Sequence, residues 1–218
     1  MKPARKDSTN LILSVICAIL VTFGVGLILS FGPVLYQQLT QPSFNASPSS
    51  IVKDPPKAVR DFVLTNQNGQ AVRLSDLRGK PLMLFFGYTH CPDVCPVTVA
   101  DFVQVKKKLG DQAGNVNFVM VTVDGDRDTP AVLKNYMKTF DTSFVGLTGS
   151  TEQVKSIAAD FGASFQKQQS AGTEASYLMA HTSFSYLLDA QGRWRLAYPF
   201  GTATDDMTQD LQKILGES

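Results

Sequence analysis

The sequence predicts a transmembrane helix near the N-terminus, followed by an α/β domain with a central mixed β-sheet flanked by helices. Three observations lead to this fold class. Two mostly apolar runs, at residues 81–88 and 116–123, are typical of strands buried on both faces of a sheet. Segments with helical periodicity alternate with these strands, as they do in βαβ units. A third apolar run, at residues 11–31, is longer than a strand and carries no charge.

The run at residues 11–31 is long enough to cross a bilayer, since about 20 mostly apolar residues span the hydrocarbon core. Three basic residues and one acid precede it, and the next charged residue is Lys53. By the positive-inside rule, the N-terminus stays in the cytoplasm and the rest of the chain is exported. We therefore expect a cytoplasmic segment at 1–10, a transmembrane anchor at 11–31, a flexible linker at 32–55 and a folded domain at 56–218.

A cleaved signal peptide is the alternative explanation of the same run. Its apolar region would usually hold about 7–15 residues and end in a small-x-small cleavage site. The run here is longer and ends in Leu29-Ser30-Phe31-Gly32-Pro33, which is a poor cleavage site. We therefore expect an uncleaved anchor, in a single-pass protein of the bacterial inner membrane whose C-terminal domain lies in the periplasm.

Within the domain, strands and helices are expected in a regular order. The segments 61–64 and 71–74 flank a turn rich in Asn and Gln and predict a hairpin. Helices are expected at residues 92–109, 129–140, 150–161 and 204–215. Further short strands are expected at residues 144–147, 182–188 and 194–198. This order predicts one mixed sheet with helices on its faces.

Composition narrows the function classes. The formal net charge is +1, which provides no strong field to attract nucleic acid, so no nucleic-acid partner is expected. The chain has three cysteines, too few for a disulfide scaffold. Cys17 lies in the first apolar run and is expected to face lipid. Cys91 and Cys95 lie together in the folded domain and are the informative pair.

The pair occurs in the run Cys91-Pro92-Asp93-Val94-Cys95-Pro96, directly after the first buried strand. With Pro92 as the first helical residue, the helix dipole and the free N–H groups would favour a thiolate at Cys91. Cys95 would lie one turn further on the same face, so the two sulfurs could form a disulfide or converge on one metal. Pro96 is expected to distort this first turn. A cysteine pair at this junction is typical of a thioredoxin-like (peroxiredoxin-like) fold.

Two thiolates and one imidazole would form a soft ligand set that suits Cu(I), and Cu(II) to a lesser degree. A structural zinc site normally needs four protein ligands, a set that is hard to assemble here without a carboxylate. The chain has two histidines, His90 and His181. His90 adjoins Cys91, and adjacent side chains of an extended segment point to opposite faces, so His181 is the better candidate. From the residues alone, His181 could equally be an ordinary histidine.

Three acidic residues, Asp124, Asp126 and Asp128, resemble part of a calcium-binding loop. The glycine and the distal glutamate of such a loop are missing at the required offsets, and Arg127 and Pro130 interrupt the pattern. We therefore expect a capped loop that leads into the following helix.

Four stretches of the domain match one known family: residues 85–96, 123–130, 144–149, and His181-Thr182 with 186–189. Through them the chain resembles the SCO/SenC family of membrane-anchored, copper-binding, thioredoxin-like proteins. The resemblance covers about residues 61–215, which is nearly the whole exported domain.

The resemblance implies roles for individual residues. Cys91, Cys95 and His181 match the copper ligands of the family. Asp124 matches an acidic residue beside the site, which would support the site without being a ligand. The resemblance also implies a partner, either the copper-centre subunit of cytochrome c oxidase or another copper chaperone.

Two features depart from the family's pattern. Gly125 stands where many members have proline, which is expected to leave that turn looser. Residues 166–180 form a polar insertion before His181, in a region that is a hairpin in the family. The sequence therefore does not predict how His181 is presented.

Two functions share the cysteine pair. The first is a copper metallochaperone for assembly of the copper centre of cytochrome c oxidase. The second is a thiol–disulfide oxidoreductase, in which Cys91 and Cys95 are the redox-active pair that keeps exported cysteines reduced. The two differ over His181, which dithiol exchange does not require. We favour the chaperone, and whether the chain also acts as a thiol–disulfide reductase stays open.

A peroxidase of the peroxiredoxin kind is disfavoured, because neither cysteine is preceded at the right offsets by the Pro and Thr of that family's motif.

Overall fold

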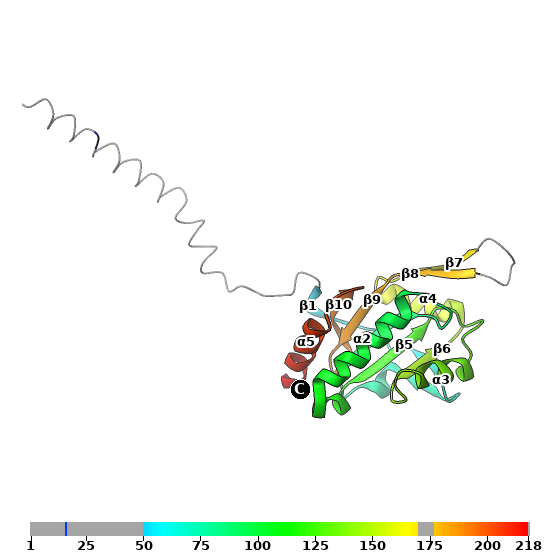
Figure 1. The fold of residues 1–218 in the computed structure, drawn as a ribbon, viewed down its shortest axis with the longest axis horizontal. Helices are drawn as coiled ribbons and strands as arrows, with labels where there is room; N and C mark the ends of the chain where they lie inside the picture. The colour runs from blue at the N-terminus through cyan, green and yellow to red at the C-terminus, as the bar shows by residue number, and fades with distance from the viewer. Residues whose placement is uncertain (1–15, 17–49, 170–176, 218) are drawn as a thin grey trace, which may run out of the picture. The chain divides into compact units, whose positions relative to one another are not determined.

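The computed structural model describes residues 16, 50–169 and 177–217. The strands of the main sheet are β1 (Ile51–Ala58), β2 (Val63–Asn66), β3 (Ala71–Arg73), β4 (Leu82–Gly87), β5 (Asn117–Thr122), β6 (Val145–Thr148), β9 (Phe184–Leu188) and β10 (Arg193–Pro199). They lie in the order β1-β10-β9-β4-β5-β6-β2-β3 (Figure 1). Strands β4, β5 and β6 are parallel, and the other neighbouring pairs are antiparallel. The sheet is therefore mixed, as the sequence predicts.

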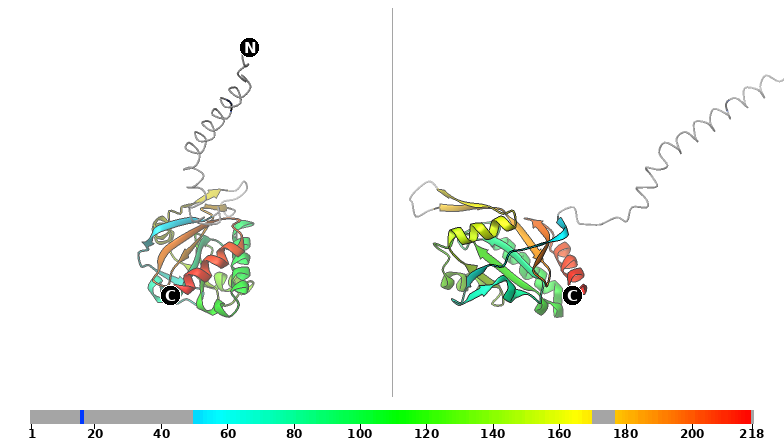
Figure 2. Two further views of the ribbon diagram at one scale, coloured as in Figure 1. Left: turned by 90° about the vertical axis from the view of Figure 1, so that its left-hand side faces the viewer. Right: turned by 180° about the vertical axis from the view of Figure 1, so that it is seen from behind.

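The helices are α2 (Val94–Leu109), α3 (Pro130–Lys138), α4 (Thr151–Asp160) and α5 (Thr204–Gly216), with 3-10 turns at Leu74–Leu77 and Gly110–Asn115. Helices α2, α3 and α5 cover one face of the sheet, and α4 covers the other (Figures 1 and 2). Strand β4 is buried along its whole length between the two layers. Phe85 packs edge-on against Phe102 of α2, whereas Phe86 packs against Phe161 at the end of α4. Alternate side chains of a strand point to opposite faces, so the continuous apolar run fills both cores.

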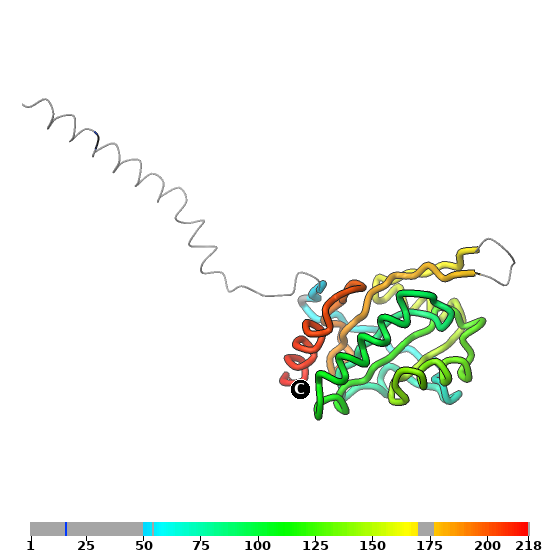
Figure 3. The backbone as a smooth tube through the Cα atoms, in the orientation of Figure 1, coloured from blue at the N-terminus to red at the C-terminus, as the bar shows by residue number. Residues whose placement is uncertain are grey.

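A separate two-stranded sheet leads to His181. Strands β7 (Phe165–Gln169) and β8 (Tyr177–His181) are antiparallel, with Phe165 opposite His181. They extend away from the main sheet (Figure 3). Strand β9 starts at Phe184 and pairs with β4, so the segment after β8 meets the edge of the sheet where β4 ends. The described strands confirm a hairpin before His181, and they bring its end to the cysteine loop.

The linker expected at residues 32–55 ends earlier than predicted, because β1 begins at Ile51 and pairs with β10. Two prolines obscure this strand in the sequence. They are accommodated because β1 is an edge strand whose register against β10 shifts around them. The predicted cytoplasmic segment 1–10, the anchor 11–31 and the rest of the linker lie outside the described residues, apart from Ile16. Within the described part of the chain, no helix is long and apolar enough to cross a bilayer.

Helix α2 begins at Val94, two residues later than expected, and Asp93 is its N-cap residue with φ −141° and ψ −80°. Pro96 therefore falls in the first turn of the helix. Backbone N–H groups have no helical partner there, so proline fits without breaking a hydrogen bond. The reason for expecting Pro96 to distort the first turn, a lost hydrogen bond to the carbonyl of Pro92, therefore does not apply in this structure.

The turn at Gly125 is packed closely rather than loosely. A Cβ atom at this position would collide with the carbonyl oxygen of Gly149, just after β6. The N–H groups of Arg127 and Asp128 both donate to the carbonyl of Asp124, at 3.1 and 2.9 Å, and close the turn. The looser turn expected at Gly125 is therefore wrong, because glycine here permits a close backbone approach.

Candidate metal centre

Cys95 lies in the first turn of α2, and its side chain has no exposed surface. Its sulfur packs against Gly87, the last residue of β4. A Cβ atom at Gly87 would lie 3.0 Å from the Cys95 sulfur and 2.6 Å from the ring of Phe85. Glycine therefore makes room for the sulfur. This role was not predicted, although a single glycine inside an apolar strand is a known sign of close approach.

Burial decides the protonation state of Cys95. It raises the pKa of the Cys95 thiol far above its usual range, and the neighbouring Cys91 sulfur and Asp128 carboxylate raise it further. A hydrogen bond from the backbone of Tyr88 opposes these effects only in part. Without a metal, Cys95 is therefore a neutral thiol with an S–H proton to donate.

Cys91 lies in the loop before α2 and is partly exposed. Its N–H donates to the carbonyl of Tyr88 at 3.4 Å, and its sulfur accepts the N–H of Cys95 at 3.4 Å. N–H groups in the first turn of a helix lack helical partners, so the sulfur satisfies one of them. Cys91 is thus placed near the positive end of α2, as predicted, but three residues before the helix begins rather than directly before it.

The two ring nitrogens of His181 have different hydrogen-bond partners, one in the backbone and the other at the sulfur of Cys95. Its Nδ1 lies 3.2 Å from the carbonyl oxygen of Thr182. A carbonyl only accepts, so Nδ1 carries the proton and Nε2 has a free lone pair. Nε2 lies 3.4 Å from the Cys95 sulfur, where it accepts the S–H. Burial lowers the pKa of His181 below its usual value, which keeps the imidazole neutral and ready to bind a metal.

The two sulfurs and one imidazole nitrogen, from Cys91, Cys95 and His181, all lie within 4.8 Å of one another. Among the described residues this is the group of side chains that could hold a metal ion. His90 is not part of it, since its side chain is 52% exposed and its Nδ1 lies 3.6 Å from a carboxylate oxygen of Asp128. The preference for His181 over His90 therefore agrees with the geometry.

A buried carboxylate organises the loop before the cysteines. Asp128 has no exposed surface and accepts hydrogen bonds from the N–H of Thr89 at 2.9 Å and from its hydroxyl at 2.6 Å. The hydroxyl of Thr122 donates to it as well. Thr89 stands two residues before Cys91, so the carboxylate fixes the backbone that presents this sulfur. This role of Asp128 was not predicted, because the acidic run was interpreted only as a capped loop.

Asp124 is also buried, and its carboxylate contacts neither cysteine nor His181. It accepts the hydroxyl of Tyr177 at 2.6 Å and pairs with the guanidinium of Arg127. Burial and this carboxylate raise the pKa of Tyr177 to about 12, so the phenol remains a donor. Tyr177 is the first residue of β8. Asp124 therefore ties the strand that ends in His181 to the loop after β5.

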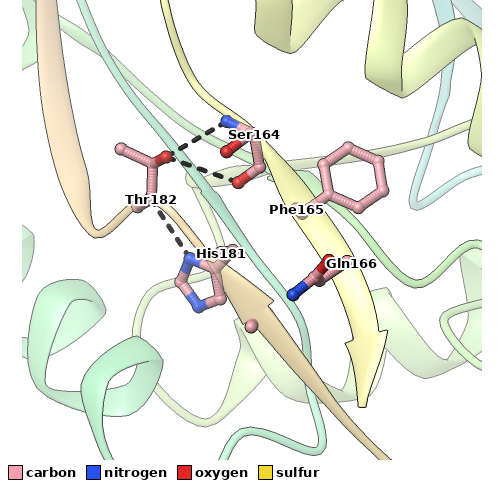
Figure 4. Close-up of a pocket in the computed structure, with 6 residues that line it drawn as sticks. Ser164, Phe165, Gln166, His181 and Thr182 are labelled. Carbon is pink, nitrogen blue, oxygen red and sulfur yellow. Dashed lines mark hydrogen bonds between the residues drawn. The ribbon is translucent and has the colours of Figure 1, made fainter.

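An open hollow of about 390 Å³ lies beside His181 (Figure 4). It is lined by Ser164, Phe165, Gln166, Ala180, His181 and Thr182. Hydrogen bonds close one side, where the N–H of Thr182 donates to the carbonyl of Ser164 at 2.9 Å and the N–H of Ser164 donates to the hydroxyl of Thr182 at 3.1 Å. Solvent can therefore reach His181, at the end of β8, through the hollow, whereas Cys95 is fully buried.

Comparison with known protein families decides the identity of this domain. The family model described as SCO1/SenC matches residues 52–216. The chain belongs to the SCO1/SenC family. The match includes all but the first residue of the main sheet, together with Cys91, Cys95 and His181, so the family resemblance seen in the sequence is confirmed.

Individual SCO proteins agree with this assignment. The SCO2-like protein of Rickettsia felis is 34% identical over 145 residues, which cover 66% of this chain and 71% of that protein. The structure of Bradyrhizobium japonicum ScoI with copper bound has a TM-score of 0.66 and 36% identity, over 72% of this chain and 99% of that chain. BsSco, described as a Sco-family cytochrome c oxidase assembly protein with a disulfide switch, has a TM-score of 0.61 and 26% identity, over 75% and 96% of the two chains.

These likenesses confirm the thioredoxin-like Sco fold, a mixed sheet flanked by helices. In this SCO protein the residues predicted as copper ligands, Cys91, Cys95 and His181, come together from a loop, a helix and the end of a hairpin. Asp124 lies apart from them and reaches the site through other side chains.

Proposed function

We propose that this protein binds one copper ion between Cys91, Cys95 and His181 and delivers it during assembly of the copper centre of cytochrome c oxidase. One observation carries the proposal: Nε2 of His181 lies 3.4 Å from the sulfur of Cys95, although the two residues are 86 positions apart in the chain. Membership of the SCO1/SenC family supports copper as the cargo, because a relative, ScoI, has been solved with copper bound.

The donor set fits copper. Two sulfurs and one neutral imidazole are soft ligands that suit Cu(I), and Cu(II) to a lesser degree. The protonated Nδ1 of His181 is already engaged by Thr182, so Nε2 needs no change of tautomer to become a ligand. Cys95, in contrast, must lose its proton before it can bind.

The geometry also favours release of the metal. His181 ends the β7–β8 hairpin, is partly exposed and borders the open hollow. Cys95 is buried against Gly87. A ligand from the recipient can therefore reach the side of the site formed by His181 more easily than the side formed by Cys95, so exchange would begin there.

The location and the recipient are part of the proposal. The uncharged run at residues 11–31, with basic residues before it, supports a single helix in the bacterial inner membrane with the copper domain in the periplasm. The description of BsSco as an oxidase assembly protein supports a recipient in that process. The copper-centre subunit of cytochrome c oxidase, or another copper chaperone, is the partner we propose.

A thiol–disulfide oxidoreductase is the second candidate, favoured by the free cysteine pair and by the disulfide switch described for BsSco. In that reaction the partly exposed Cys91 attacks a disulfide of the target and releases one thiolate. Cys95 then gives up its proton to the thiolate already released and attacks the Cys91 sulfur of the mixed disulfide, which expels the second thiolate of the target and leaves a Cys91–Cys95 disulfide and a reduced target. The deep burial of Cys95 and the presence of His181 are not explained by this function.

An anaerobic copper titration of the full chain tests the two candidates together with an insulin-reduction assay. We expect one copper per chain, and a loss of at least about a hundredfold in affinity for His181→Ala, which removes a ligand. His90→Ala is the matched control, because it removes the second histidine of the chain without touching the cluster. Full affinity in His181→Ala would exclude His181 as a ligand. Strong insulin reduction without copper binding would favour the oxidoreductase.

A further inference from the structure

The loop after β5, residues 124–128, is hydrogen-bonded to both halves of the candidate copper site. Its last residue, Asp128, holds the cysteine loop by accepting the N–H of Thr89 at 2.9 Å and its hydroxyl at 2.6 Å. Its first residue, Asp124, holds the β7–β8 hairpin by accepting the hydroxyl of Tyr177 at 2.6 Å. One short loop therefore supports the two segments that must meet at the metal.

The loop is closed on itself, so its two carboxylates keep a fixed separation. The N–H groups of Arg127 and Asp128 both donate to the carbonyl of Asp124, at 3.1 and 2.9 Å. The N–H of Asp124 donates to the hydroxyl of Thr122, the last residue of β5, at 3.0 Å. The support is thus continuous with a central strand of the main sheet.

Asp124, Arg127 and Tyr177 form a closed set of hydrogen bonds, in which each residue is bonded to the other two. Nε of Arg127 donates to one oxygen of the Asp124 carboxylate at 2.5 Å, and the Tyr177 hydroxyl donates to the other oxygen. Nη1 of Arg127 donates to the carbonyl of Tyr177 at 3.2 Å. The guanidinium carbon also lies 3.6 Å from the centre of the Tyr177 ring, within the range of a cation–π contact. Both the side chain and the backbone of Tyr177 are therefore bound to the loop after β5.

The place of Tyr177 in β8 determines which face of the strand carries His181. Successive side chains of a strand alternate between its faces, so Tyr177, Met179 and His181 share one face. Tyr177 and Met179 are buried, whereas Leu178 between them is 43% exposed. A slip of one residue would turn His181 to the opposite face. The bonds at Tyr177 therefore fix the register of the strand four residues before the candidate ligand.

We propose that Tyr177 is a positioning residue for the copper site, which keeps His181 within reach of Cys95 by binding β8 to the loop after β5. The inference rests on the proposed copper-binding function. Groups that orient metal ligands commonly change metal affinity by about 10–100-fold. Without the bonds at Tyr177, the hairpin opens more often, and the metal loses its imidazole ligand during each opening.

Tyr177→Phe tests this role, because it removes the hydroxyl and keeps the ring that lies against Arg127. Tyr186→Phe is the matched control, since Tyr186 is also buried but its hydroxyl has no hydrogen-bond partner among the described residues. Both variants are made in the full chain and are checked for an unchanged circular dichroism spectrum.

Competition for Cu(I) under anaerobic conditions measures each substitution in the wild type and in His181→Ala. In the wild type, Tyr177→Phe should lower the affinity by at least about tenfold. In His181→Ala it should change the affinity by less than about twofold, because the imidazole that Tyr177 positions is gone. A general loss of stability would lower the affinity in both backgrounds. Tyr186→Phe should match its parent in each.

Amide hydrogen exchange of the copper-free protein gives a readout that does not depend on copper. Exchange in β8 should be faster in Tyr177→Phe than in the wild type, because the strand opens more often. Tyr186→Phe should leave the exchange of β8 unchanged.

Two affinity results would overturn the inference: Tyr177→Phe equal to Tyr186→Phe in the wild-type background, or an equal loss with and without His181. If the wild type binds no copper, the proposed function fails, and hydrogen exchange decides whether Tyr177 holds the strand. Faster exchange of β8 in Tyr177→Phe would then still support that role, and unchanged exchange would overturn it.

Discussion

Copper affinity should rise steeply with pH, because copper must displace the proton of Cys95. The thiol is fully buried, and burial raises its pKa far above the neutral range. Its S–H donates to Nε2 of His181, 3.4 Å away. The metal-free protein therefore keeps this proton throughout the range from pH 7 to pH 9, and binding releases it.

The size of the effect follows from the number of protons. Each proton displaced makes the apparent affinity rise about tenfold per pH unit, which is about 1.4 kcal/mol. Burial lowers the pKa of His181 below its usual value near 6.5, so the imidazole is already neutral above pH 7 and adds nothing to the slope. Between pH 7 and pH 9 the affinity should therefore increase by at least about a hundredfold.

Competition for Cu(I) against a chromophoric chelator, under anaerobic conditions at several pH values, measures this slope once the chelator's own pH dependence is known. Cys95→Ser is the control. Copper does not displace the proton of a serine hydroxyl in this pH range, so the increase of log affinity per pH unit should be smaller by one than in the wild type. An affinity that stays level from pH 7 to pH 9 would refute the reasoning, since it would mean that Cys95 is either a thiolate before copper binds or no ligand.

Two further substitutions test the support around the site. Gly87→Ala should push the Cys95 sulfur out of place, with a loss of about 1–3 kcal/mol in unfolding free energy and of at least about tenfold in copper affinity. Gly114→Ala, where an added Cβ meets no atom within 4 Å, should leave copper affinity unchanged, and equal effects of the two would contradict the packing argument. Asp128→Ala leaves Thr89 and Thr122 without their buried acceptor and should cost at least about 3 kcal/mol in guanidinium unfolding. Asp126→Ala serves as its control, and a loss below about 1 kcal/mol for Asp128→Ala would show that the carboxylate does not hold the loop.

The central part of the fold was predictable because its signal is local. The run at residues 81–88 is apolar at nearly every position, and the structure buries Phe85 and Phe86 in opposite layers. Helix α4 was equally predictable, since it lies within the range expected at 150–161, and the hydroxyl of Ser150 caps its start by accepting the N–H of Gln153. In both cases a few adjacent residues are enough to predict the strand or helix.

Two wrong predictions came from prolines, whose local preferences are overridden by the tertiary structure around them. Pro92 suits the first position of a helix, yet α2 starts only at Val94, after a loop shaped by Asp128 and Thr89. The prolines near residue 55 argue against a strand, yet an edge position tolerates them in β1.

The site was predictable only in part, because its contacts join distant segments. The cysteine pair alone supported either redox or metal chemistry, and the family resemblance added His181. The contact between Gly87 and Cys95, and the bonds from Thr89 to Asp128 across 39 positions, depend on how the chain returns to the end of β4. No spacing rule in the sequence shows such contacts.

X-ray absorption spectroscopy of the Cu(I)-loaded full chain tests the central claim most directly, because it counts the atoms bound to the metal. The proposed site predicts two sulfur neighbours and one imidazole nitrogen, from Cys91, Cys95 and His181. In His181→Ala the nitrogen should disappear while both sulfurs remain. A wild-type shell with fewer than two sulfurs, or an imidazole that persists in His181→Ala, would contradict the account.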